Sequence, residues 1–351
     1  MIKSLSPYYL NIEWNPYSTS AIPEKYDLKL YIWNGVKSSP GSPIVTLQNV
    51  NPFARTDTAK VDISRYVRGF ISSNFIKDTV TSINDGKGLT WVKTEVIYYL
   101  NGVAQPPENV NTYLASKGYG YGLEGENTQS PTNNVLSTEI EQKISVNSKY
   151  LFSFLGSETV STVIVVKSEN VTKTFTKTAS TNSNDLLQTI NIVASDFSGD
   201  QYIEILKDNV LINTLLITEE PRYTPIDVVF LNKEGALQTL TFFKEKVETL
   251  KIESENYESS NGQALDGVHQ FKTYNVNGKT SFNVNSGFVK EDNNEIFKQL
   301  SLSDLIWQLK GNVYIPLNID SKSLEYKSRQ KDRLLNYKFD FSYSFSEKNS
   351  I

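Results

Sequence analysis

Two groups of acidic side chains have a spacing that would suit acid–base chemistry or a hard cation. Glu291, Asp292 and Glu295 form one group, and the sequence DFSGD at 196–200 forms the other. The first group lacks the alternating oxygen ligands and central glycine of a calcium loop, and it precedes apolar residues at helical spacing, which indicates helix capping. The second group has the composition of a turn between strands. Neither group therefore predicts a catalytic pair or a metal site.

Residues that carry nucleophilic or metal chemistry are almost absent. The chain of 351 residues contains one histidine, no cysteine and one methionine. This composition excludes disulfides, thiolate nucleophiles, Cys/His zinc sites and relays that need two imidazoles. His269 lies where a loop meets a strand, with no second histidine to complete a site, so a structural role is favoured. We therefore expect no enzymatic activity, no metal and no cofactor.

A glycine-rich segment, Gly118-Tyr-Gly-Tyr-Gly122, contains two candidate interface residues. It follows no strong strand and opens no helix, so it is a poor phosphate cradle. Tyr119 and Tyr121 are instead candidate aromatic anchors for another chain or a glycan, because tyrosine offers a large contact area at low entropic cost. The alternative is a loop that latches onto its own protein. The sequence leaves both interpretations open.

A basic run near the C-terminus contains three further interface candidates, Lys327, Arg329 and Arg333. Acidic residues within the run dilute its charge, and the whole chain has a net charge of −4 and a pI of about 5.4. A strip that is solvated or contacts another subunit is therefore favoured over a dedicated polyanion site, with a passing contact with DNA as the weaker alternative.

The composition and the alternation of residues predict a mainly β protein. Aromatic residues make up 12% of the chain, with 20 tyrosines and 17 phenylalanines, and aromatic and β-branched residues fit pleated, half-buried surfaces. Residues 26–33 and 337–345 alternate between apolar and polar side chains, as half-buried strands do. No secretory signal and no apolar run long enough to span a bilayer are evident, so we expect no membrane insertion.

The pattern along the chain predicts three β units, at residues 1–138, 139–220 and 221–351. The first is a β-sandwich-like module with a short helix over 62–71. Its apolar periodicity disappears from residue 101 to 138, which predicts a long Gly/Pro/Asn-rich loop and the first boundary. The second unit contains six predicted strands with the 8–12-residue spacing of an immunoglobulin- or fibronectin-like sandwich, at residues 150–155, 160–167, 171–178, 186–193, 201–206 and 210–217.

The third unit, residues 221–351, combines strands with one helix. The spacing predicts a helix over 291–300, whose Phe297 and Leu300 cover the aromatic face of the last strand. That face contains four aromatic residues: Phe339, Phe341, Tyr343 and Phe345. One hairpin is expected around Lys310-Gly-Asn312, and another is expected to turn at Val276-Asn-Gly278.

Several segments resemble virion proteins of tailed bacteriophages that infect Bacteroidetes, the crAss-like phages among them. The resemblance rests on three groups of segments: SPYYLNIEW, YDLKLYIWNG and VDISRYVRGFI; EEPRYTPIDVVFLNKEGALQTLTFFK and KIESENYE; and LSLSDLIWQL, VYIPLNID and NYKFDFSYSFS. The last group is similar to the tail-tube-like barrel of phage hub and distal-tail proteins. The resemblance covers most of the chain except residues 101–138, and the GYGYG segment has no counterpart in it.

The resemblance implies a non-enzymatic structural protein of the tail or neck, made in the host cytoplasm and located in the virion. It implies a homo-oligomeric ring, six- or twelve-fold, around the channel through which the genome leaves, with other tail or neck proteins as neighbours. Closed symmetry would also cover exposed strand edges. A carbohydrate-binding or receptor-binding adhesin of the tail tip is the alternative, and a glycoside hydrolase with two carboxylates is a third hypothesis that no pair of acids supports.

Overall fold

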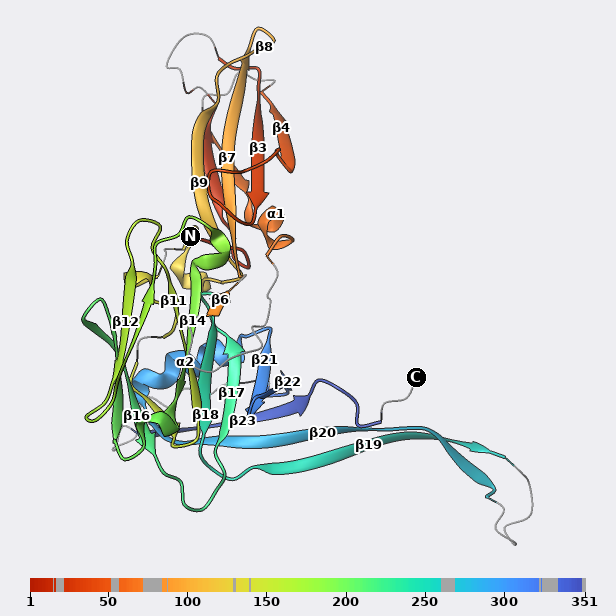
Figure 1. Ribbon diagram of the computed structural model, residues 1–351. Coiled ribbons are helices and arrows are strands. Elements are labelled where there is room, and N and C mark those ends of the chain that lie inside the picture. Colours follow the sequence, from red (N-terminus) through yellow and green to blue (C-terminus); the bar gives the residue numbers. More distant parts are fainter. Residues whose placement is uncertain are drawn as a thin grey trace.

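The computed structural model describes residues 1–14, 16, 22–51, 57–71, 84–86, 88–128, 131–138, 140–259, 269–321, 323 and 334–348. Within these residues the protein is mainly β, as predicted, with five sheets and two short α-helices. An elongated N-terminal sheet stands on a body made of the later sheets, and a long hairpin leaves that body to one side (Figure 1). The described helices are all too short to cross a membrane.

The N-terminal part contains two sheets that share one core. Strand β3 (Lys25–Trp33) confirms the predicted alternation, since Tyr26, Leu28, Leu30 and Ile32 are buried. It lies in a six-stranded sheet of order β1-β9-β7-β3-β4, in which β8 also pairs with β7. A separate two-stranded sheet joins β2 to β5. The bounds of the other strands are β1 (Ile2–Lys3), β2 (Tyr9–Glu13), β4 (Val45–Val50), β5 (Thr58–Asp62), β7 (Leu89–Leu100), β8 (Val103–Ala104) and β9 (Glu108–Ser116).

Helix α1 (Ser64–Arg68) confirms the helix that was predicted over 62–71, in a shorter form. The carboxylate of Asp62 accepts hydrogen bonds from the backbone and the hydroxyl of Ser64, which satisfies donors of the first turn. Ile63 and Val67 are fully buried in the N-terminal core. The helix therefore closes one end of this core.

The loop that was predicted from residue 101 to 138 was wrong over its first half. Residues 103–116 contain β8 and the nine-residue strand β9, which pairs with β7 from Ser116 to Glu108. The first residues of β9 are polar because one side of this strand faces solvent, and a β-bulge at Asn109 (φ 50°) breaks its alternation. Hydrogen bonds to β7 hold this strand in place, although few of its side chains are buried, so its sequence lacks the alternation that would predict a strand. Two 3₁₀ helices follow, η1 (Gly122–Glu124) and η2 (Thr132–Asn134).

The middle part contains a five-stranded sheet, order β10-β16-β15-β12-β13, and a three-stranded sheet, order β11-β14-β6. The six strands predicted here are confirmed, and they enclose a core that includes Phe152, Phe154 and Phe197. Strand β6 (Asn84–Gly86) comes from the N-terminal part of the chain. The other elements are β10 (Gln142–Ser145), β11 (Lys149–Leu155), β12 (Thr162–Lys167), β13 (Thr172–Lys177), η3 (Ser183–Asp185), β14 (Leu187–Val193), η4 (Ala194–Phe197), β15 (Tyr202–Lys207) and β16 (Val210–Thr218).

The C-terminal part is a seven-stranded sheet of order β18-β17-β21-β22-β23-β20-β19. It curls so that the backbone N–H of Lys244, just after β18, donates to the carbonyl of Asn285 in β20 at 3.2 Å. The bounds are β17 (Ile226–Leu231), β18 (Leu237–Phe242), β19 (Val247–Glu258), β20 (Phe271–Lys290), η5 (Glu291–Asn293), α2 (Asn294–Ser301), β21 (Ile306–Lys310), β22 (Val313–Ile319) and β23 (Leu334–Tyr343).

Helix α2 covers the aromatic face of β23, as predicted. Phe297 stacks near Phe339 with ring centroids 6.0 Å apart, and Phe341 lies in the same buried cluster. Phe345 was expected under the helix, but this prediction was wrong, because its ring is half-exposed and stacks on Tyr343 instead. Helix α2 has only eight residues and covers the part of the aromatic face that contains Phe339 and Phe341.

The hairpin predicted to turn at residues 276–278 was also wrong. These residues lie inside β20, a strand of 20 residues, and Asn275 (φ 50°) forms a β-bulge there instead of a turn. Gly278 gives the exposed side chain of Leu250 room on this face, since a Cβ at this position would lie 2.8 Å from its Cδ1. Asparagine and glycine adopt positive φ in bulges as well as in turns, so the dipeptide alone misplaced the turn.

Two small apolar clusters connect the three larger cores. Leu89, Leu136 and Ala236 meet in one cluster, and Leu151, Val229 and Leu309 meet in the other. Each of these clusters draws residues from more than one of the predicted units. The boundaries at 138 and 220 themselves remain predictions.

Candidate functional site

Strands β19 and β20 form a long hairpin, here called the arm, which projects away from the body (Figure 1). The two strands pair in antiparallel register from Val247–Asn283 at the root to Glu258–Phe271 near the tip. The root belongs to the seven-stranded sheet, but every residue of β19 is exposed. A two-stranded ribbon that packs on nothing is marginally stable in water, so the arm has the features of a segment that another surface covers.

The face of the arm that carries Leu250 continues the face of the sheet that packs on the core. Side chains in a strand alternate between faces, so Phe282 and Val284 share one face of β20 with Gly278 and Thr280. Leu250 pairs with Thr280 and Ile252 pairs with Gly278, which places both on this same face, here called the arm apolar face. Beyond the bulge, the alternation of β19 places Glu258 and its partner Phe271 on it as well. Phe282 and Val284 are 2% and 1% exposed, whereas Leu250, Ile252 and Phe271 are 53%, 63% and 63% exposed.

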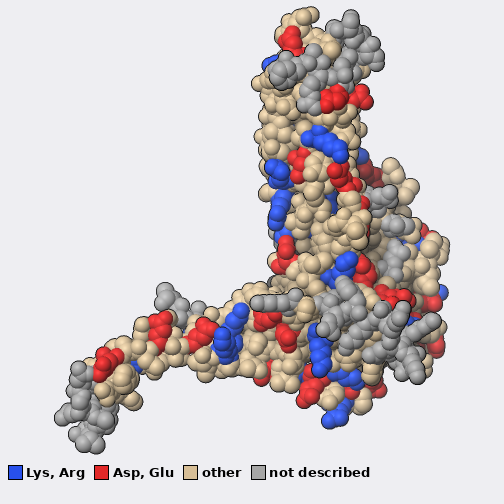
Figure 2. Space-filling model, turned by 180° about the vertical axis from the view of Figure 1, so that it is seen from behind, with Lys and Arg blue, Asp and Glu red and all other residues tan. Residues whose placement is uncertain are grey.

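The outer edge of β19 is also uncovered in the described structure. This strand is the last of its sheet, and its 12 residues pair with β20 on one side only. The unpaired N–H and C=O groups of such an edge form a template for another strand. Charged side chains are scattered along the arm and are separated by uncharged surface (Figure 2). Four glutamates and one lysine lie in β19.

The root of the arm is fixed by a cluster around Lys246. The ammonium group of Lys246 lies 4.2 Å from the ring centroid of Phe282 and donates to the hydroxyl of Tyr343 at 3.2 Å. It also pairs with Glu248, and this hydrogen bond lowers the pKa of the Glu248 carboxyl. Farther out, the rings of Tyr257 and Tyr274 pack edge to face at 5.6 Å on the opposite face. These contacts hold the two strands together without covering the arm apolar face.

Tyr119 and Tyr121 lie against helix α2 of the same chain. The hydroxyl of Tyr121 donates to Oε1 of Glu295 at 2.8 Å, and Nζ of Lys298 lies 3.3 Å from the Tyr121 ring centroid. The hydroxyl of Tyr119 approaches the carbonyl of Gln299 at 3.5 Å. Burial raises the pKa of both phenols, and the hydrogen bond to Glu295 raises that of Tyr121 further. This geometry favours the latch interpretation over a pair of exposed anchors.

The glycines of this segment permit a close approach to another part of the chain. A Cβ on Gly118 would lie 2.7 Å from the carbonyl oxygen of Lys233, and the backbone N–H of Tyr119 donates to that oxygen at 2.8 Å. Gly235 (φ 81°) lies opposite, where a Cβ would meet the Gly118 backbone at 2.8 Å. Backbone therefore packs directly on backbone between the N-terminal and C-terminal parts.

The remaining predicted candidates occupy separate places. Lys327, Arg329 and Arg333 lie outside the described residues. Residues 196–200 lie in η4 and the turn between β14 and β15, as predicted, and Asp200 accepts hydrogen bonds from Ser168 and Asn170 of the β12–β13 turn. His269 is exposed. Among the described residues, no three His, Cys, Asp or Glu side chains are grouped to hold a metal ion.

No protein-family model matches this chain, and no curated protein sequence is significantly similar to it.

The arm is the feature that sequence reasoning missed. Residues 247–258 and 271–282 have equal length and flank a Ser/Asn/Gly-rich segment, which is the signal of one long hairpin. The Asn-Gly pair at 277–278 is itself a turn signal, and it points to a different turn. The exposure of the arm apolar face had no sequence signal, because its residue types are those of a buried strand.

Proposed function

We propose that this chain is a non-enzymatic structural subunit of a tailed phage, assembled into a ring in the tail or neck, in which the arm of each copy docks on the next copy. The exposed arm apolar face is the observation that carries the proposal. Leu250, Ile252 and Phe271 are somewhat more than half exposed, so leaving them in water forgoes about 1–2 kcal/mol for each side chain that a partner could bury. The sequence resemblance to phage tail and neck proteins supports the same interpretation.

A second copy is the occupant to which this proposal commits. On the side of the body away from the arm lies the five-stranded sheet with β12 (Figure 1), which ends in the edge strand β13. Thr172, Thr174 and Thr176 of β13 are exposed, and the strand contains two lysines and no acidic residue. Of the four glutamates of β19, Glu248 and Glu253 pair with Lys246 and Lys251, and Glu255 and Glu258 leave an acidic excess that complements β13 in charge. Because donor and acceptor edges lie on opposite sides, the contact is heterologous, which is the type that forms rings when the rotation between copies closes.

The finer architecture belongs to the same proposal. The curled C-terminal sheet around α2 is consistent with a tail-tube-like barrel, since the hydrogen bond from Lys244 to Asn285 joins its first strand to its sixth. The two facing sheets of the middle part, around one core, fit an immunoglobulin- or fibronectin-like sandwich. The N-terminal sheets would contact adjacent rings or decorate the outside.

The assembly of the full chain in solution tests the proposal. The variant Leu250→Ser/Ile252→Ser removes two apolar side chains from the arm apolar face and leaves the cores intact. We expect the wild-type chain to form a closed oligomer by light scattering and electron microscopy. We expect the double variant to weaken association by roughly a hundredfold, since it loses two buried side chains at each contact.

A matched control lies on the opposite face of the same strand. Val247 is 49% exposed, and Val247→Ser/Thr249→Ser has the same spacing and the same replacement residue. This control should assemble like the wild type. A wild-type chain that stays monomeric at all concentrations overturns self-association and leaves another virion protein as occupant. Equal assembly of both double variants overturns the role of the arm apolar face.

A further inference from the structure

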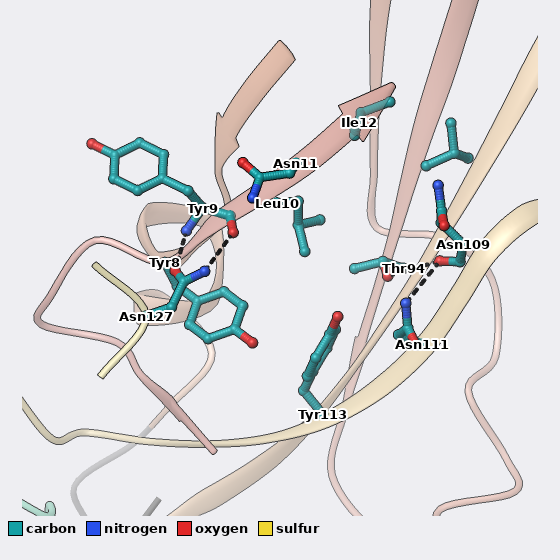
Figure 3. A pocket seen from close by; sticks show the side chains of 11 residues that line it. Tyr8, Tyr9, Leu10, Asn11, Ile12, Thr94, Asn109, Asn111, Tyr113 and Asn127 are labelled. Atoms are coloured by element: carbon teal, nitrogen blue, oxygen red, sulfur yellow. Dashed lines mark hydrogen bonds between the residues drawn. The ribbon is translucent and has the colours of Figure 1, made fainter. Parts of the chain in front are cut away.

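A pocket in the N-terminal part lies between the β2–β5 sheet and the face of strands β7 and β9. Its volume is about 170 Å³. Its floor contains the buried residues Ile12, Thr94 and Val96. Tyr8 and Tyr113 line it with two rings whose centroids lie 5.6 Å apart, edge to face. Four asparagines, Asn11, Asn109, Asn111 and Asn127, complete the polar lining (Figure 3).

A β-bulge shapes this pocket. The register between β7 and β9 shifts between Thr94 and Val96, and Asn109 in the bulge has a φ of 50°. Its carbonyl oxygen lies 3.4 Å from both the hydroxyl of Thr94 and the side-chain amide of Asn111. Bulges redirect side chains and are frequent beside binding sites. Here the bulge places Asn109 and Asn111 together on the wall of the pocket (Figure 3).

Asn127 holds the opposite wall. Its side chain accepts from the backbone N–H of Tyr9 at 2.7 Å and donates to the carbonyl of Tyr9 at 2.9 Å, so the η1 side of the chain is pinned to β2. The Tyr113 hydroxyl points from β9 into the space between these walls (Figure 3). Burial raises the pKa of Tyr8 and Tyr113, so both phenols remain protonated at neutral pH.

The chemistry of this lining selects a neutral, hydroxyl-rich ligand. None of the described residues that line the pocket is charged, so an ionic ligand would lose hydration without gaining a counter-charge. Phenol and amide groups both donate and accept hydrogen bonds, which matches the hydroxyl groups of a sugar. The pocket volume is below the range of about 300–1,000 Å³ for drug-sized ligands, so the pocket suits a single sugar ring. No carboxylate is present among these residues for glycosidic hydrolysis.

We infer that this pocket binds one neutral sugar ring, as a free monosaccharide or as the end of a glycan, independently of any ring assembly. The full chain is tested against a panel of neutral and anionic monosaccharides by ligand-observed NMR. We expect at least one neutral sugar to bind with millimolar affinity and the anionic sugars to bind more weakly.

The variant Tyr8→Phe/Tyr113→Phe removes both hydroxyl groups and keeps both rings, so the surrounding packing is preserved. We expect it to weaken sugar binding by roughly tenfold, because two hydrogen bonds are lost. Tyr202→Phe, at a partly exposed tyrosine in β15, is the matched control and should bind like the wild type. Absence of binding by every neutral sugar overturns the inference. Undiminished binding by the double variant, or stronger binding of the anionic sugars, also overturns it.

Discussion

The two halves of strand β20 contain similar residues in very different surroundings. In the inner half, Phe282 and Val284 lie in the core beneath α2 and β23. The outer half continues the same face of the same sheet, but there Phe271 faces solvent, as do Leu250 and Ile252 on the paired strand β19. In both halves side chains alternate between the two faces of the sheet, and both halves form backbone hydrogen bonds with a neighbouring strand.

This comparison shows that pairing and burial are separate requirements of a sheet. Hydrogen bonds to β19 extend the ribbon beyond the body, whereas cover from α2 and β23 ends near Phe282. The C-terminal segment covers a little more, since the backbone N–H of Glu347 donates to the carbonyl of Gly278 at 2.9 Å. Beyond that point nothing in the described chain protects the apolar face, which is the physical basis of the proposed docking.

The largest contrast is expected between Phe339→Ala and Ile252→Ala. Phe339 is buried between Phe242 and Phe297, so its truncation should lower the free energy of unfolding by about 3–5 kcal/mol. Ile252 has no cover within the chain, so its truncation should change that free energy by less than about 0.5 kcal/mol. Urea unfolding of the monomeric form at low concentration measures both values. Similar losses in the two variants would mean that the arm packs on its own body.

An intermediate effect on stability is expected at Tyr121, which contacts Glu295 and Lys298 of helix α2. Tyr121→Phe removes the hydrogen bond to the Glu295 carboxylate and keeps the ring under Lys298. We expect a loss of about 1–2 kcal/mol in unfolding free energy, because hydrogen bonds to charged groups contribute somewhat more than neutral ones. Tyr223→Phe, at a half-buried tyrosine just before β17, is the control and should be neutral. An unchanged midpoint for Tyr121→Phe would show that the latch does not stabilise the helix.

The smallest effect on stability is expected at Asp227 of β17. This residue lies on the face of the C-terminal sheet that packs against the middle part. Its Oδ1 accepts from the hydroxyls of Ser148 and Thr241 at 2.7 and 2.6 Å. Burial removes water from the carboxyl group and raises its pKa above the ordinary value of about 3.9, although the two hydrogen bonds act in the opposite direction. The folded state therefore holds the proton more tightly than the unfolded state, and stability should fall as pH rises from about 4 through the raised pKa.

Asp227→Asn keeps Oδ1 as the acceptor for both hydroxyls and removes the titration. We expect the stability of this variant, relative to the wild type, to increase as pH rises through that window and then to level off. Thermal unfolding of both proteins across pH 4–8 measures the difference. A difference that is independent of pH would show that Asp227 titrates normally in the folded protein.

The local pattern predicted most elements because strand alternation and helical spacing are properties of neighbouring residues. The six strands of the middle part, the hairpin around Gly311 and the helix with Phe297 are all confirmed on this basis. Strand β9 was missed because it is held by pairing with β7 and has little apolar alternation. The turn of the arm was misplaced because Asn275 forms a bulge and Gly278 lies beside Leu250 of β19, both inside the continuous strand β20.

The candidate sites depended on contacts between distant residues. Tyr119 and Tyr121 were recognised as unusual, but their attachment to α2, more than 170 positions away, is set by packing. The pocket of Tyr8 and Tyr113 likewise joins segments over 100 positions apart.

By itself, the sequence determined that this protein is mainly β, that it contains no cysteine and a single histidine, and where most strands and both helices lie, because these properties depend on composition and short-range periodicity. Only the tertiary structure decided that β19 and β20 form one projecting arm and which of its apolar side chains are exposed to solvent. Whether an apolar side chain is buried depends on what packs over it, and that partner can be far away in the sequence or in another molecule.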